Sequence, residues 1–444
     1  MPDSFYTAIP QYHLKRQQQL DIAKAALSSA YTVLHSSVHE IVMSDGKELI
    51  VYDQERRLVL VGTAHGPLQL VSYERGPGGG HGRREQGDGV SEESLNSGYY
   101  KRFFVEVKKI GAGSSGAVWL VRHHINYLEL GEYALKKVPI GDSLEWLKIV
   151  LTEVKILEQI KVHPNIIGYK HSWLEMDQTA DFGPKVPCLF ILMEYANGGN
   201  LEDFVFSRRE GLLDTEIWIF FLDLLFGIDY LHSMGIIHRD IKSPNILLHQ
   251  DVDSKLKSRR NRLMISDFGT CVNNKFVKEA SRTGNTGTPE WNAPELLIKD
   301  SEGKWGDYSA CCDMWGLGLC LHFMAFGRLP WKASRANLKN LYEEIMKCHV
   351  ELSETPSRSS DMIYLIKALL QKDPSRRPTS RDLILSLPIR NLVKSLNDPQ
   401  LTRLLADVIL QGPHTTSFSA RSPVQFDNST TATSQAYPKL HFDL

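Results

Sequence analysis

The sequence is poor in cysteine and shows no metal-ligand spacing among the cysteines it has. Six cysteines occur in 444 residues, with no Cys-x-x-Cys pair. They are Cys188, Cys271, Cys311, Cys312, Cys320 and Cys348. Disulfide frameworks and zinc modules need regular spacings. Both are therefore disfavoured, and we expect a reducing compartment, the cytoplasm or the nucleus.

The sequence also has no excess of positive or negative charge. Lys and Arg number 51 against 52 for Asp and Glu, so the formal net charge is −1. Proteins dedicated to nucleic acid carry a positive field that attracts polyanions. We therefore expect no nucleic-acid partner.

No segment has the features of a signal peptide or a membrane span. The N-terminal MPDSFYTAIPQYHLKRQQQ lacks an apolar core and a glycine at position 2, and the C-terminal FDL is not a prenylation box. The apolar run 311–326 has 16 residues and contains Asp313 and His322, whereas a spanning helix needs about 20 apolar residues. We therefore expect a buried core helix there and no transmembrane segment.

Changes of composition divide the chain into five predicted parts. The first combines a helix-compatible stretch, 14–33, with alternating apolar and polar residues over 40–62 that predict a small β-meander. Glycine and charge dominate the linker after it, and Ser and Thr dominate a C-terminal tail that we expect to be disordered. The parts are an N-terminal extension, 1–75; the linker, 76–98; a β-rich and then helical domain, 99–388; an amphipathic helix or helix pair, 389–411; and the tail, 412–444.

Three glycines with G-x-G-x-x-G spacing lie between two strand-like segments. Gly111, Gly113 and Gly116 separate VEVKKI from AVWLVR, so the sequence predicts a β-hairpin. A dinucleotide site of the Rossmann type needs a helix that opens at the third glycine and an acidic residue about 20 positions later. Neither is present, and the motif alone is a weak sign of a nucleotide site.

A lysine and a glutamate downstream strengthen that sign. The strand-like Tyr-Ala-Leu-Lys segment that ends at Lys136 would let this lysine reach the α and β phosphates of a nucleotide. The segment 143–160 has apolar residues at helical spacing, with Glu153 at the edge of the apolar stripe. Paired with Lys136, Glu153 would hold the ammonium toward phosphate. Without further motifs, a lysine at a strand end is usually a solvated surface residue, and a glutamate at a helix edge more often has no special role.

The region after these residues carries a long, chemically complete motif. Five motifs occur in order: the glycine loop, YALK at 133–136, HRDIKSPN at 238–245, DFG at 267–269 and APE at 293–295. This series resembles the eukaryotic protein kinases, and chance agreement of five motifs is negligible. The resemblance covers about residues 100–388 and says nothing about the flanks.

The resemblance implies an α+β, bilobed protein kinase fold, with a β-rich N-lobe and an α-helical C-lobe. It implies ATP and Mg²⁺ as cofactors and a Ser/Thr-containing protein as substrate. Phosphoryl transfer leaves the protein mainly positioning and charge neutralisation, so Asp240 would accept the hydroxyl proton and Lys242 would contact the γ-phosphate. The implied catalytic residues are Asp240, Lys242, Lys136 and Glu153, and the implied Mg²⁺ ligands are Asn245 and Asp267.

The resemblance also implies a nucleotide-binding set. Adenine would lie between apolar side chains and bond to the backbone after a gatekeeper, Met193, and Asn200 would stand at the ribose-contacting position. The set is Gly111, Gly113, Gly116, Val118, Ala134, Lys136, Glu194, Ala196, Asn200 and Leu247.

By the same resemblance His238 is a packing residue, although a histidine beside Asp240 invites an acid–base role. It would join Leu157, Tyr169 and Phe268 in a hydrophobic column between the lobes. Asp313 on the buried helix would anchor that column. Further along, Glu295 would pair with Arg377 in a structural ion pair.

The substrate hydroxyl is expected to belong to serine or threonine, because Lys242 and Gly287-Thr288 resemble the serine/threonine kinases. Trp173-Leu-Glu175 with the inserted loop after it is similar to the stress-responsive translation-initiation-factor kinases. The N-terminal meander is more similar to fungal Iks-type kinases, which we favour. A regulatory partner for the N-terminal extension fits this picture.

Two features depart from the simplest kinase pattern. The basic run KLKSRRNR at 255–262 lies on an expanded hairpin, where we expect it to be solvated. A second Asp-Phe-Gly at 181–183 lies in a polar loop, and we expect it to bind no metal.

The function predicted is phosphoryl transfer from Mg²⁺-ATP to Ser/Thr hydroxyls of protein substrates in intracellular signalling. The alternative from another class is a catalytically silent pseudokinase scaffold. Such chains commonly lose the lysine, the loop aspartate or the metal aspartate, and here Lys136, Asp240 and Asp267 are all present. A small-molecule kinase of related fold is less favoured, because the APE segment and its arginine partner are complete.

Overall fold

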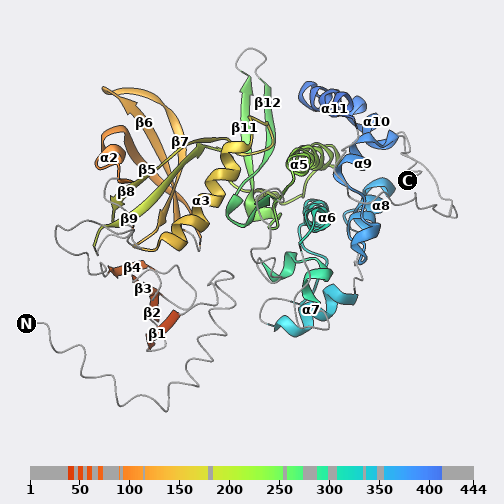
Figure 1. The fold of residues 1–444 in the computed structure, drawn as a ribbon. Helices are drawn as coiled ribbons and strands as arrows, with labels where there is room; N and C mark the ends of the chain where they lie inside the picture. Colours follow the sequence, from red (N-terminus) through yellow and green to blue (C-terminus); the bar gives the residue numbers. More distant parts are fainter. Residues whose placement is uncertain are drawn as a thin grey trace, which may run out of the picture. The chain divides into compact units, whose positions relative to one another are not determined.

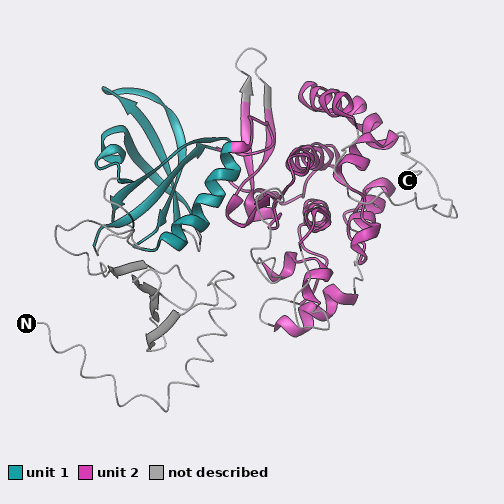
Figure 2. Ribbon diagram, in the orientation of Figure 1, with its two compact units in different colours: residues 1–158, 168–195 teal, residues 159–167, 196–444 magenta. Residues whose placement is uncertain are grey.

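The computed structural model describes most of the chain in two compact units, residues 1–158 with 168–195 and residues 159–167 with 196–444 (Figure 2). The predicted helix 14–33, the Asp-Phe-Gly at 181–183 and the tail beyond 412 lie outside the described residues. Those described are the strand backbones 39–44, 49–53, 58–62 and 69–73, and residues 90, 94–113, 116–178, 184–253, 258–273, 288–298, 308–333, 337–347 and 355–412.

The N-terminal extension contains a four-stranded antiparallel sheet in sequence order (Figure 1). Its strands are β1 (His39–Ser44), β2 (Leu49–Asp53), β3 (Leu58–Gly62) and β4 (Gln69–Tyr73). The predicted range of the β-meander, 40–62, was too short, because the observed sheet has a fourth strand, β4. Six residues separate β4 from β3, and no two-residue turn signal marks the connection in the sequence.

The first unit also contains a five-stranded antiparallel sheet in the order β5-β6-β7-β9-β8 (Figure 1). The apolar run VPCLFIL of β9 is buried, as suits a strand with a neighbour on each side. Helix α3 confirms the helix predicted over 143–160. The elements are α2 (Tyr99–Phe103), β5 (Phe104–Gly113), β6 (Gly116–Ile125), β7 (Leu128–Pro139), α3 (Leu144–Gln159), β8 (Tyr169–Asp177) and β9 (Val186–Glu194).

Helix α2 packs against this sheet through aromatic side chains. The ring centroid of Tyr100 lies 5.1 Å from that of Phe190, which stacks on Trp173 at 5.1 Å with 8° between the planes. The carboxylate of Glu175 accepts the backbone N–H of Gly98 at 2.8 Å and of Tyr100 at 2.9 Å. These bonds satisfy donors that a helix N-terminus otherwise leaves open, so α2 belongs to the sheet's own core.

The second unit is mainly helical, and α5 and α6 form its centre. Helix α6 is buried along almost its whole length, Asp313 and His322 included, which confirms the core helix predicted over 311–326. Within the described part of the chain, no helix has both the length and the apolar content that crossing a bilayer requires. The helices are α4 (Leu201–Ser207), α5 (Asp214–Ser233), α6 (Ala310–Phe326), α7 (Leu338–Lys347), α8 (Ser360–Leu369), α9 (Ser380–Leu385), α10 (Leu387–Leu396) and α11 (Pro399–Gln411).

Two small antiparallel ribbons complete the second unit. One joins β10 (Ile236–Ile237) to β13 (Val272–Asn273), and the other joins β11 (Ile246–Asp253) to β12 (Ser258–Ile265). Short 3₁₀ segments lie at Ser243–Asn245, Phe268–Thr270, Pro289–Trp291, Pro294–Leu297 and Pro374–Arg376. The predicted motifs of the helical lobe thus lie on or between these short elements.

The predicted ion pair between Glu295 and Arg377 is confirmed. Arg377 Nη1 and Nη2 donate to the two carboxylate oxygens of Glu295 at 2.6 and 2.7 Å. The guanidinium also lies 4.9 Å from the ring centroid of the fully buried Trp315. A bidentate pair of this kind fixes geometry as well as energy, so it ties the APE segment to the helical core.

The surroundings of His163 in the second unit favour the neutral form of its ring. Its ring stacks on Tyr230 at 4.8 Å, and its Nδ1 accepts the backbone N–H of Asn165 at 3.1 Å. Burial lowers the pKa of His163 from 6.5 to about 4, and the charge of Arg262 adds to the effect. The neutral ring is therefore the native form.

The stability of the protein should depend on His163 between pH 6.5 and pH 4. Because the folded-state pKa lies below the unfolded value, its contribution is complete above pH 6.5 and is lost as the pH falls through 4. We expect the wild type to lose about 2–3 kcal/mol over this range that His163→Gln does not lose. Urea unfolding at several pH values measures this, with the exposed His171→Gln as control. Parallel curves for wild type and His163→Gln would contradict the assignment.

Candidate active site

Lys136 and Glu153 form a buried ion pair in the first unit. Lys136 Nζ donates to Glu153 Oε1 at 2.8 Å and Oε2 at 3.0 Å, from β7 to α3. The side chains are only 8% and 6% exposed. The sequence placed Glu153 at the edge of an apolar stripe, but the structure buries it, because Lys136 supplies the compensating charge that a buried carboxylate requires.

The glycine loop is a β-hairpin, as predicted. Strands β5 and β6 pair up to Gly113 opposite Gly116. Gly116 has a φ of +147°, and a Cβ atom there would lie 2.1 Å from the carbonyl oxygen of Lys137. No other residue type fits this contact. The close approach of the hairpin to β7 therefore depends on Gly116.

The predicted nucleotide-binding set is divided between the two units. Val118 and Ala134 lie on the adjacent strands β6 and β7, and Glu194 ends β9. Ala196, Asn200 and Leu247 belong to the second unit.

Asn200 has a structural role that the sequence reasoning did not include. It is the N-cap of α4, and its side chain accepts the backbone N–H of Asp203 at 2.8 Å and donates to the Asp203 carboxylate at 2.8 Å. An asparagine directly before an apolar–acidic helical segment is a sequence signal for such a cap. The ribose contact of Asn200 stays a prediction.

Two residues of the predicted catalytic loop, Asn245 and Lys242, converge on the carboxylate of Asp240. Asn245 Nδ2 donates to Asp240 Oδ2 at 2.8 Å and to the Asp240 carbonyl at 3.0 Å. Lys242 Nζ lies 2.7 Å from Asp240 Oδ2 and donates to Thr288 Oγ1 at 2.8 Å. The motif residues thus lie close together, with the hydroxyl of Thr288 beside them.

Asp313 of α6 holds the backbone that leads into this loop. Its carboxylate accepts the backbone N–H groups of His238 and Arg239, each at 2.9 Å, and contacts His232 Nε2 at 2.9 Å. Burial alone would raise the pKa of Asp313, but the hydrogen bonds and charge of His232 and the bond from His238 hold it below its ordinary value. Asp313 is therefore a buried anion that anchors the loop.

His238 has structural partners. Its Nε2 lies 3.0 Å from the carbonyl oxygen of Ser266, and its ring meets Phe268 edge-on at 5.2 Å. These contacts favour the predicted packing role over an acid–base role. The remainder of the predicted column, Leu157 and Tyr169, belongs to the first unit, and the column as a whole stays a prediction.

Asn245 and Asp267 lie at the base of the β11–β12 ribbon. Ile246 pairs with Ile265 there, and the Ser266 N–H donates to the Asn245 carbonyl at 3.0 Å. Asp267 has φ +62° and ψ +77°, a left-handed conformation that costs a non-glycine residue roughly 1–3 kcal/mol and is typical of functional sites.

This donor set fits Mg²⁺. Both bonds recorded for the Asn245 side chain use Nδ2, which leaves Oδ1 as its ligand atom, and Asp267 adds carboxylate oxygens. Oxygen donors of this kind are what Mg²⁺ prefers, and in phosphotransferases one or two protein ligands suffice because phosphates and water complete the shell.

Lys137 is a buried charged residue to which the sequence analysis assigned no role. It points to the other face of β7 and binds Glu106 at 2.5 Å and Asp177 at 3.0 Å. Its ammonium also lies 4.3 Å from the ring centroid of Tyr100. The period of two along a strand separates the two lysines onto opposite faces, and that signal was available in the sequence.

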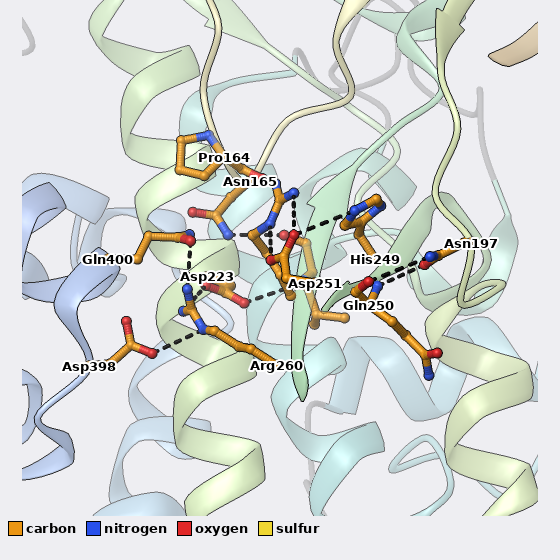
Figure 3. A network of polar contacts seen from close by, with 12 residues as sticks. Pro164, Asn165, Asn197, Asp223, His249, Gln250, Asp251, Arg260, Asp398 and Gln400 are labelled. Atoms are coloured by element: carbon orange, nitrogen blue, oxygen red, sulfur yellow. Dashed lines mark hydrogen bonds and ion pairs between the residues drawn. The ribbon is translucent and has the colours of Figure 1, made fainter. Parts of the chain in front are cut away.

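The expectation that the basic run 255–262 is solvated was wrong for Arg262 and Arg260, and Figure 3 shows the contacts of Arg260. Arg262 is only 9% exposed; it donates to Asp251 at 3.0 Å and to the carbonyl oxygen of Pro164. Arg260 pairs with Asp398 at 2.9 Å and with Asp223 at 3.4 Å. The partners of Arg260 lie on α5 and at the start of α11, too far away along the chain for a local pattern to reveal them.

The fold and this constellation define the class of protein. A five-stranded antiparallel lobe with a buried lysine–glutamate pair and a helical lobe with the Asp240 loop are the parts of a bilobed protein kinase fold. The model of the protein kinase domain family matches residues 104–387, and the chain belongs to this family. Protein kinases use ATP with Mg²⁺.

Similar proteins point to the serine/threonine branch. A Dictyostelium discoideum protein named "Probable serine/threonine-protein kinase iksA" is 50% identical over 318 residues, covering 67% of this chain and 32% of that relative. The maize "Probable serine/threonine-protein kinase CCRP1" is 29% identical over 340 residues, 76% of this chain and 48% of the relative. The chain thus spans about a third to a half of these relatives. The first match supports the resemblance to Iks-type kinases.

Lys137 should matter for stability. We expect Lys137→Met to lower the free energy of unfolding by about 2–3 kcal/mol, because it leaves Asp177 and the half-exposed Glu106 without their shared cation. Urea unfolding of the full chain measures this, and Lys108→Met, an exposed lysine on β5, is the matched control. Equal losses in the two variants would show that the buried network contributes nothing specific.

Proposed function

We propose that the chain transfers the γ-phosphoryl group of Mg²⁺-ATP to serine or threonine hydroxyls of protein substrates, as a signalling kinase of the cytoplasm or nucleus. The observation that carries this proposal is the convergence of Asn245 and Lys242 on the Asp240 carboxylate, at 2.8 and 2.7 Å. Membership of the protein kinase family supports it.

The reaction assigns each group of the loop a role. The substrate hydroxyl oxygen bonds to the γ-phosphorus, the bond from that phosphorus to the β–γ bridging oxygen breaks, and ADP leaves. Asp240 accepts the hydroxyl proton, and Lys242, oriented by Asp240 and Thr288, offsets charge on the transferring phosphoryl group. Bound Mg²⁺ supplies further neutralisation of the phosphate oxygens, and Asn245 and Asp267 would hold it.

In the first unit, the Lys136–Glu153 pair is the proposed clamp for the α and β phosphates. Glu153 keeps the ammonium in place at 2.8 Å, so little rotamer freedom remains to be lost when phosphate binds. The glycine hairpin ending at Gly116 would cover the phosphates. The adenine contacts of Val118 and Leu247 complete the proposed cofactor site.

The proposed domain division keeps the kinase domain at 99–388, slightly longer than the family match. Residues 99–103, which precede the family match, are included because they form α2, whose Tyr100 packs on Phe190 of the sheet. The extension 1–75 and linker 76–98 precede it, and the helical segment 389–411 and the tail 412–444 follow. A regulatory partner for the extension is part of the proposal. A pseudokinase scaffold is disfavoured, because Lys136, Asp240 and Asp267 are all retained.

The direct test is a radiolabelled-phosphate assay on a degenerate Ser/Thr peptide array. Asp240→Asn should lower kcat by about 10²- to 10⁴-fold, because it removes the positioned base and keeps the shape of the side chain. Asp407→Asn, an exposed residue of α11, serves as the control. Wild-type turnover in folded Asp240→Asn would overturn the role of this carboxylate, and no transfer by the wild type would overturn the proposal.

The two Asp-Phe-Gly segments provide a second test. Asp267→Ala should lower turnover about 100-fold or more, since it removes a metal ligand. Asp181→Ala should leave turnover near the wild-type value, because its segment precedes β9 and lies far from the catalytic loop in sequence. Paired assays at matched ATP and Mg²⁺ make the comparison. A loss of activity in folded Asp181→Ala would show that the motif assignment around β9 is wrong.

A further inference from the structure

The β11–β12 ribbon links the two proposed metal ligands. Its pairing runs without a register shift from Ile246 opposite Ile265 to Asp253 opposite Ser258. Asn245 immediately precedes β11, and Asp267 lies two residues after the end of β12. Because a regular ribbon moves as one body, the contacts that fix β12 also fix where Asp267 stands relative to Asn245.

Arg260 of β12 makes polar contacts with residues of two helical segments of this unit (Figure 3). Its guanidinium lies 3.4 Å from the carboxylate of Asp223 on α5. It also lies 2.9 Å from Asp398 and donates to Gln400 at 2.5 Å. Asp398 is the N-cap of α11 and accepts the Leu401 N–H at 2.9 Å. One arginine therefore joins a strand, a core helix and the start of α11.

Asp223 strengthens this connection by bonding to the strand itself. Its second carboxylate oxygen accepts the backbone N–H of Leu263 on β12 at 3.0 Å. The side chain of Asp223 is fully buried. Burial raises the pKa of Asp223 to about 7, against the opposing charge of Arg260. The Asp223 side chain therefore contacts both the guanidinium and the backbone of β12.

The C-terminal end of α11 is also linked to α5, through Arg381. Arg381 lies 2.8 Å from the buried Asp229 on α5 and donates to the carbonyl oxygens of Val408 at 3.2 Å and Gly412 at 3.1 Å. Helix α11 is thus held at both ends by arginines that neutralise buried carboxylates of α5. It lies beyond residue 387, where the family match ends.

We propose that α11 is a positioning element of the metal site and that Arg260 is the positioning residue through which it acts. Through Arg260, α11 holds β12 in the place that sets Asp267 against Asn245. The inference rests on the proposed function, because it takes these two residues as the metal ligands. A purely structural α11 would change stability and leave metal affinity unchanged.

The test measures metal affinity directly on the full chain. Free Mn²⁺ is followed by its electron paramagnetic resonance signal during titration in the presence of a non-hydrolysable ATP analogue. Arg260→Met removes the connection. Asp398→Asn with Gln400→Ala removes the negative charge and the amide acceptor that α11 presents to Arg260, and it keeps the ion pair with Asp223. This double variant decides the question if Arg260→Met does not fold.

We expect the Mn²⁺ dissociation constant to rise about 3- to 10-fold in both variants, below the 10- to 100-fold effect of residues that contact a metal ligand directly. The Mg²⁺ concentration for half-maximal turnover should rise by the same factor. Arg403→Met, an exposed arginine on α11, should change neither. Thermal denaturation of each variant gives its stability separately.

The outcomes distinguish this inference from the proposed function. An unchanged Mn²⁺ dissociation constant in the folded double variant overturns the positioning role, even if its melting temperature falls. If the wild type transfers no phosphate to peptides, the proposed function fails, whereas weaker Mn²⁺ binding in the variants still supports the positioning role. Equal weakening in Arg403→Met would show that the effect is not specific to Arg260.

Discussion

The carboxylate of Asp313 is the constraint on which the catalytic loop depends. It lies inside α6 and binds two successive backbone N–H groups, those of His238 and Arg239. Arg239 has φ +69°, a conformation that an arginine adopts only at a cost. Charge-assisted hydrogen bonds in a dry interior are strong enough to offset that cost. Helix α6 has the composition of an ordinary apolar core helix, yet through Asp313 it fixes the backbone that leads into Asp240.

Buried carboxylates also bind distant segments of the chain elsewhere in the helical unit. Asp223 and Asp229 lie on α5, which is otherwise an apolar buried helix, and each meets an arginine from a distant segment. A buried charge without a partner is costly, so each carboxylate selects one arrangement of the surrounding elements. Apolar packing brings α5 and α6 together, whereas the buried acids define how the loops and the last helix attach to them.

The sequence predicted the parts of this structure that depend on local order. The spacing of apolar residues located α3, and a continuous apolar run located α6. The short motif around Asp240 brought its residues together because they are neighbours in the chain. It missed β4 and the partners of Lys137, and it expected Arg260 to be solvated. Arg260 meets groups 37 and 140 residues away, and no periodicity within a segment carries information about such pairs. Burial of a single charged residue is a property of the whole fold.

The aromatic packing of α2 determines where a recombinant fragment of this domain should begin. The family match begins at Phe104, yet the ring of Tyr100 covers Phe190 and supports the ammonium of Lys137. A recombinant fragment that started at the family boundary would lack Tyr100 and would expose the aromatic side chains of the sheet that α2 covers. Fragments for crystallisation or inhibitor screening should therefore begin before Gly98, because the backbone N–H of Gly98 donates a hydrogen bond to the Glu175 carboxylate.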